Sequence, residues 1–202
     1  MRRVFVSHAC LWIVALWWPV AFAQESRIAA TVGQQKILFQ DGYQGFRAFP
    51  DEPICILKTK PLQFLMVGVL NKGGETFLWE GTTLEKARPI KKVLGIGPPG
   101  SFDCNYAGIS AIVRHKDNNE ILGIYHCEDD TDMPPDPENP DTVGAYWTIA
   151  MSASKDGGHN FEKLGQIITG PAKGSMNRSV YGAGIAGMCA DHTGQYLRAI
   201  AS

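Results

Sequence analysis

The sequence predicts an all-β protein in which a four-stranded unit repeats. Glycine and proline are plentiful, at 22 and 12 of 202 residues, and polar turns separate many short apolar runs. After residue 23 no run has convincing helical periodicity. Repetition of a four-stranded antiparallel unit is typical of a β-propeller.

The inner half of the predicted unit occurs three times. Each copy joins two short apolar strands through a polar turn, as in a β-hairpin. The strand pairs are predicted at residues 52–58 and 63–69, at 108–114 and 121–126, and at 184–190 and 195–200.

The outer half occurs twice, at residues 75–86 and 146–157, where a strand leads into a tight turn rich in Ser and Thr. Further strands follow at 90–94 and 164–168, which completes units of two inner and two outer strands. A β-sandwich is the alternative all-β fold, but it does not predict matching inner pairs.

The turn after residue 153 carries a motif, Ser-Lys-Asp-Gly-Gly-His-Asn-Phe, at 154–161. Asp156 can accept hydrogen bonds from the backbone N–H groups of its own turn, Gly157 and Gly158 permit positive φ, and Phe161 can anchor the hairpin. The motif resembles the Asp-box of sialidase-like β-propellers, Ser/Thr-x-Asp-x-Gly-x-Thr-Trp/Phe, with Asn160 in the Thr place. The resemblance implies a propeller in a carbohydrate context, with a structural role for the box itself.

Residues 1–23 are predicted to be a signal peptide. Arg2 and Arg3 precede an apolar run at 9–20, and Ala21-Phe22-Ala23 forms a cleavage site. The run is short for a spanning helix, so no stable membrane anchor is expected, with an uncleaved anchor as the alternative. The mature chain is predicted to be secreted or periplasmic.

Residues 24–202 are predicted to form one partial propeller domain. They are few for a complete propeller at about 40–50 residues per blade, and the sequence ends inside a predicted strand at 197–202. We therefore expect about three blades of a five- or six-bladed propeller, as the N-terminal fragment of a longer chain.

Net charge bears on the expected binding partners, and the cysteines bear on disulfides and metal sites. A formal net charge of −1 indicates neither nucleic acid nor an anionic surface as a binding partner. The four cysteines after residue 23 can pair in three ways, with Cys104–Cys127 favoured because it flanks one predicted hairpin; four buried thiols are the alternative. No cysteine pair has zinc-site spacing, so no metal or cofactor is predicted.

Carboxylates near the ends of the inner strands are the candidate catalytic groups. Asp51 precedes the first inner pair, Asp103 precedes the second, and Glu128 follows its return strand. The arrangement resembles five-bladed glycoside hydrolases of the family 43, 62 and 130 type. This implies a secreted hydrolase in which one carboxyl protonates the leaving oxygen and another activates water or attacks.

The resemblance also departs from the pattern of these families. Glu52 interrupts the Asp-Pro pair expected at Asp51, and the third unit has no acid near its entry at 181–184. The strand end Tyr-His-Cys-Glu at 125–128 resembles a Tyr-His-x-Glu strand end of this superfamily.

The candidate sugar-binding residues lie close to these acids. Arg47 loosely resembles the Arg-Ile-Pro motif of sialidases, Tyr106 can stack on a sugar ring, and His126 and Asp129 flank Glu128. The alternative function is a non-catalytic propeller that binds glycans or proteins, in which the acids are ordinary loop carboxylates.

Overall fold

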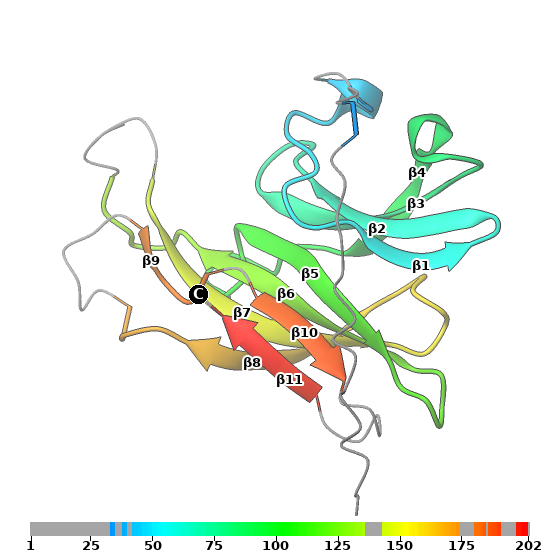
Figure 1. Cartoon of the computed structure of the whole chain (residues 1–202). Helices are drawn as coiled ribbons and strands as arrows, with labels where there is room; N and C mark the ends of the chain where they lie inside the picture. Colours follow the sequence, from blue (N-terminus) through cyan, green and yellow to red (C-terminus); the bar gives the residue numbers. More distant parts are fainter. Residues whose placement is uncertain are drawn as a thin grey trace, which may run out of the picture. The chain divides into compact units, whose positions relative to one another are not determined.

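The computed structural model describes residues 33–34, 38–39, 42–135, 143–173, 180–184, 186–190 and 197–201 (Figure 1). The chain divides into two compact units, Met1–Lys36 and Ile37–Ser202, and the description below concerns the second. The predicted signal peptide lies outside the described residues. In the described part, no helix is long and apolar enough to cross a membrane.

The described residues confirm the all-β class. Two 3-10 turns, η1 (Tyr43–Gly45) and η2 (Leu84–Lys86), are the helical elements among them. The strands are β1 (Cys55–Thr59), β2 (Leu62–Gly68), β3 (Gly74–Gly81), β4 (Arg88–Leu94), β5 (Tyr106–Arg114), β6 (Ile121–Asp129), β7 (Ala145–Ser154), β8 (Glu162–Thr169), β9 (Val180–Gly182), β10 (Ala186–Ala190) and β11 (Leu197–Ala201).

Strands β1 to β4 form an antiparallel sheet in chain order, as the first predicted unit requires. Side chains alternate between the two faces of a strand, so consecutive apolar residues in this sheet make both of its faces apolar. Phe64 and Met66 of β2 join one core cluster, whereas Leu65 joins another on the opposite face.

Aromatic residues of the preceding segment cover one face of the first sheet. The rings of Phe39, Tyr43, Phe46 and Phe49 all lie within 6.4 Å of the Trp79 ring, measured between centroids. Trp79 is fully buried as a result.

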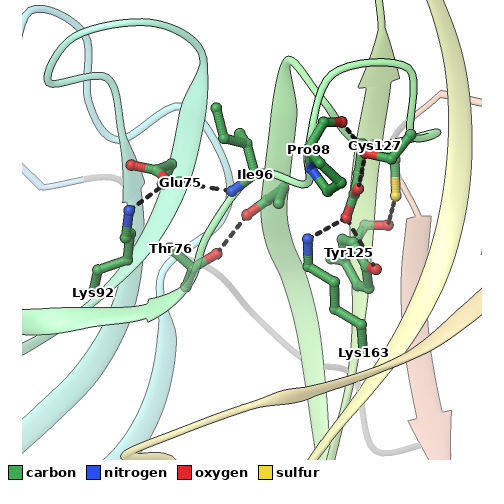
Figure 2. Close-up of polar contacts among 11 residues, drawn as sticks. Glu75, Thr76, Lys92, Ile96, Pro98, Tyr125, Cys127 and Lys163 are labelled. Atoms are coloured by element: carbon green, nitrogen blue, oxygen red, sulfur yellow. Dashed lines mark hydrogen bonds and ion pairs between the residues drawn. The ribbon is translucent and has the colours of Figure 1, made fainter.

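Strands β5 to β8 form a second antiparallel group, here called the second sheet (Figure 1). It is hydrogen bonded to the first sheet through β3, and one core cluster contains residues of both sheets. The junction is a short parallel pairing of Gly74 with Tyr106 and of Glu75 with Ala107. Thr76 Oγ1 donates to Ala107 O at 3.0 Å and accepts from Ile109 N at 2.9 Å, as Figure 2 shows in part. A side chain at Gly74 would begin 2.1 Å from the Tyr106 ring, so this junction requires glycine.

The third unit begins with the same kind of junction. β9 pairs in parallel with the start of β7, and β10 and β11 form the third predicted inner pair. Met188 of β10 and Ala183 pack against Ile124 and Ile149 of the second sheet. Sequence analysis missed β9, and the described strands do not close into a ring.

The motif at residues 154–161 forms the β7–β8 turn, with Asp156 as the predicted acceptor. Asp156 Oδ1 accepts from Ser154 Oγ and from the backbone N–H groups of His159 and Asn160, at 2.8 to 3.0 Å. Gly157 and Gly158 have φ of 77° and 98°. The hydrogen bond from the Asn160 side chain, above all, lowers the pKa of Asp156 to about 2.

The same turn docks on the first sheet. Phe161 N donates to Val93 O at 3.1 Å, and its ring belongs to the core cluster shared by the two sheets. Lys91 Nζ donates to Asn160 Oδ1 at 2.7 Å. The motif therefore closes its own hairpin and fastens neighbouring sheets together.

We predict that Asp156→Ala lowers the free energy of unfolding by about 1 kcal/mol at pH 6, because the turn loses the carboxylate that accepts its hydrogen bonds. The loss is no larger because solvent screens the charge of this carboxylate. The pKa of Asp156 falls from 3.8 to about 2 on folding, so the contribution is complete above pH 3.8 and is lost as the pH falls toward 2. Denaturant titrations across this range measure it. Asp117→Ala, in the exposed β5–β6 turn, is the control; equal losses in both variants would contradict the prediction.

Candidate active site

Four side chains converge at one end of the second sheet. Tyr106 at the start of β5, Glu128 near the end of β6 and Trp147 near the start of β7 are register partners in one row across the three strands. His126 lies two residues before Glu128 and shares its face of the sheet. The register alone therefore brings an acid, an imidazole and two aromatic rings together.

The segment before β1 adds two acids to this end. Asp51 N donates to Val67 O at 3.3 Å, and Tyr106 Oη donates to Asp51 O at 3.4 Å. The result is a pocket of about 170 Å³ lined by Asp51, Glu52, Tyr106, His126, Glu128 and Trp147. A pocket of this size suits one small ring rather than an extended ligand, since the pockets that bind drug-sized ligands have volumes of about 300–1,000 Å³.

Gly108, opposite His126, lets the segment before β1 that carries Asp51 and Glu52 approach the second sheet. A Cβ at this position would lie 2.3 Å from the Tyr106 ring and 3.1 Å from Cγ of Glu52. Any other residue would push Glu52 or Tyr106 out of the pocket.

Both oxygens of Glu128 are held. Oε1 lies 3.3 Å from His126 Nε2, and Oε2 accepts from Asn105 Nδ2 at 3.2 Å. The His126 ring is itself fixed between Tyr106 and Trp147, each in an edge-on arrangement with centroids 5.2 Å away. This carboxylate has a defined orientation before any ligand enters.

Glu52 is the buried acid of the pocket, with 7% of its surface exposed. The pKa of Glu52 is raised to about 7, and burial is the largest cause. The neighbouring His126 lowers this pKa, whereas Asp51 and Glu128 raise it further. Burial, followed by the neighbouring acids Asp51, Glu52 and Glu128, also raises the pKa of the Tyr106 hydroxyl. At neutral pH a large share of the Glu52 carboxyl groups therefore carry a proton.

Unsatisfied polar atoms gather in this pocket. In the described part of the chain, four buried side-chain nitrogen or oxygen atoms have no hydrogen-bond partner within the protein. Three of them, Glu52 Oε2, His126 Nδ1 and Trp147 Nε1, belong to pocket-lining residues. Buried polar groups are normally paired, so these atoms mark a place for a polar ligand or water.

Four predicted site residues, Asp51, Tyr106, His126 and Glu128, thus meet in one pocket. Asp103 does not line it. It is buried, lies 2.5 Å from Lys163 Nζ through Oδ2, and accepts from Ser101 Oγ and Tyr125 Oη. Figure 2 shows Lys163 and Tyr125 beside this group. The contacts of Asp103 are those of a structural ion pair.

The other two predicted binding residues also lie outside the pocket. Asp129 Oδ2 pairs with Lys173 Nζ at 2.7 Å; burial alone would raise its pKa, but hydrogen bonds from Lys173 and Thr131 outweigh this and lower it. Arg47 is exposed and its Nη1 lies 3.4 Å from Asn71 O.

Sequence analysis missed Glu52 and Trp147 as pocket residues. Glu52 was interpreted as the first residue of a predicted strand and as an interruption of the Asp-Pro pair. Trp147 had a usable signal, because pairing the predicted strands at 121–126 and 146–152 in register places it beside Glu128.

The disulfide expected between Cys104 and Cys127 is not formed. Both are buried free thiols. Cys104 Sγ lies 3.5 Å from Asp129 Oδ1, whereas Cys127 Sγ donates to Tyr125 O at 3.6 Å inside the sheet. Each thiol thus has a hydrogen-bond partner of its own.

Cys104, Asp129 and Asp130 form a cluster whose potential ligand atoms all lie within 4.8 Å of one another. Each carboxylate already has a lysine partner, with Lys173 on Asp129 and Lys72 at 3.3 Å from Asp130. These lysines balance the charge that a cation would otherwise compensate.

Comparisons of the chain with protein-family models, with curated proteins and with solved structures gave no match.

We predict that Asp103→Asn lowers the free energy of unfolding by about 2–3 kcal/mol, because it leaves Lys163 without its charged partner. Denaturant unfolding at pH 7 measures the loss. Lys163→Met and the double variant complete a cycle, in which the two single losses should not add. Additive losses would show that the two side chains do not interact.

We predict that Glu52→Gln stabilises the fold at neutral pH. The pKa of Glu52 rises from 4.5 to about 7 on folding, so an unfavourable contribution develops as the pH rises from 4.5 and is complete above 7. The variant should match the natural chain below pH 4.5 and exceed it by at most about 3 kcal/mol above pH 7. Unfolding curves measured from pH 4 to 8 test this, and a difference independent of pH would contradict it.

Proposed function

We propose that the protein is a carbohydrate-active β-propeller that hydrolyses glycosidic bonds in the pocket between Glu52 and Glu128. The observation that carries this proposal is the meeting of three carboxylates, an imidazole and two aromatic rings at one end of consecutive sheets. Two carboxyl groups with different proton affinities are the minimal equipment for glycoside hydrolysis.

The propeller part of the proposal rests on how the units repeat. Two four-stranded antiparallel sheets follow one another, and the third strand of each pairs in parallel with the strand that opens the next unit. The Asp-box turn joins the third and fourth strands of its sheet, the outer pair of a blade. Ordinary β-sandwiches have no such repeated junction.

The two glutamates have complementary roles. Glu52 retains a proton near neutral pH and serves as the general acid that protonates the leaving oxygen. Glu128, held by His126 and Asn105, serves as the base that activates water or as the nucleophile that attacks the sugar carbon. Glu52 was not among the three candidate catalytic carboxylates of the sequence analysis, which were Asp51, Asp103 and Glu128.

The aromatic side chains supply the sugar-binding surface. Trp147 and Tyr106 flank the pocket, and aromatic rings stack on the apolar faces of sugar rings. A non-catalytic glycan-binding module would need these rings too, but it would gain nothing from a protonated acid beside an oriented carboxylate.

Hydrolysis of a panel of aryl pentosides and hexosides by the purified protein tests this function. Glu52→Gln and Glu128→Gln should each lower kcat by about 10²–10⁴-fold. In the natural chain kcat/KM should fall as the pH rises through about 7, because Glu52 loses its proton there. Glu52→Gln should lack this falling limb.

Glu120→Gln, in the β5–β6 turn and not among the residues that line the pocket, is the matched control and should retain full activity. Sugar binding without hydrolysis of any glycoside would favour the non-catalytic alternative. Hydrolysis that survives both pocket substitutions would place the active site elsewhere.

A further inference from the structure

The pocket contains one carboxylate more than hydrolysis needs. Glu52 and Glu128 form the proposed pair, and Asp51 lines the same pocket from the segment before β1. Its backbone is tied down through Val67 and Tyr106, and its side chain is exposed at the rim. A third acid raises the repulsion between charges in the pocket, as the effect of Asp51 on the pKa of Glu52 shows.

The described lining residues offer little positive charge to balance these acids. His126 is the only basic side chain among them, and its Nε2 already faces Glu128. Arg47 and Lys72 line a different pocket. With Glu52 protonated, Asp51 and Glu128 still face at most one imidazolium, so the site excludes sugar acids and attracts a cation.

The unpaired atoms show what else the ligand carries. Trp147 Nε1 is a donor and needs an acceptor, which a sugar hydroxyl or ring oxygen provides and an alkylammonium ion does not. His126 Nδ1, on a residue with 4% of its surface exposed, and Glu52 Oε2 also have no hydrogen-bond partner within the protein. The ligand therefore combines a positive charge with several hydroxyl groups.

We infer that the pocket recognises a sugar with a free amino group, with the ammonium at Asp51 and the hydroxyl groups at Trp147 and His126. The inference rests on the proposed carbohydrate function and specifies its substrate class. It assigns Asp51 to recognition of the amino group rather than to proton transfer. The neighbouring Glu128 adds to the negative potential, while Glu52 keeps its proton for the leaving group.

Calorimetric binding of methyl glycosides tests the inference without requiring turnover. The probes are 2-amino-2-deoxy sugars of gluco, galacto and manno configuration, their N-acetyl counterparts, the parent neutral sugars and a uronic acid. At about pH 6, where the amine is charged, at least one amino sugar should bind about tenfold more tightly than its N-acetyl counterpart. The preference should shrink when the salt concentration is raised from about 0.05 to 1 M.

Asp51→Asn should reduce this tenfold preference to about twofold or less, because it removes the charge and retains the shape. Glu120→Gln is again the matched control and should keep the full preference. Circular dichroism establishes that each variant is folded.

The outcomes separate the two proposals. Tighter binding of the amino sugar without hydrolysis of any aryl glycoside would support this inference and overturn the hydrolase. Hydrolysis with equal affinity for amino, N-acetyl and neutral sugars would overturn the inference and leave the hydrolase standing. Tighter binding of the uronic acid, or a preference that Asp51→Asn leaves unchanged, would also overturn it.

Discussion

The arrangement of the site depends on the two-residue parallel junction between β3 and β5. Gly74 lies against the Tyr106 ring there, and Thr76 bonds to the backbone of β5 on both sides of Gly108. Since β1 to β4 are hydrogen bonded as one sheet, fixing β3 against β5 also fixes the segment that carries Asp51 and Glu52. Asp51 and Glu52, which precede the first sheet, are thus placed beside the imidazole and aromatic rings of the second sheet by backbone geometry, without a long loop.

The strands were predictable to the extent that their patterns are local. The four-stranded units and the β7–β8 turn follow from alternating burial, glycine positions and turn residues, all of which act within a few residues. β9 escaped prediction because it is three residues long and exists only through its pairing with β7. The aromatic cover on the first sheet escaped as well, since nothing local to Phe39, Tyr43, Phe46 and Phe49 indicates which surface their rings cover.

The candidate site was predictable where strand register decides it. Glu128, His126 and Tyr106 lie at paired strand ends, so the hairpin pattern brings them together. Asp103 is also near a strand end, but its side chain meets Lys163 from β8, a contact between residues sixty positions apart that no local pattern encodes. Glu52 was missed for a related reason: its altered proton affinity comes from burial, which depends on a glycine in another sheet.

The aromatic cover has a consequence for how sheets can be added to this protein. The face of the first sheet around Phe64 and Trp79 is filled by Phe39, Tyr43, Phe46 and Phe49, so the chain supplies its own cap there. In arrays of stacked units, a capped end stops lateral growth, whereas an open apolar face invites a further unit. Any sheet that packs on this face of the first sheet, the last blade of the proposed propeller included, must therefore displace four packed rings.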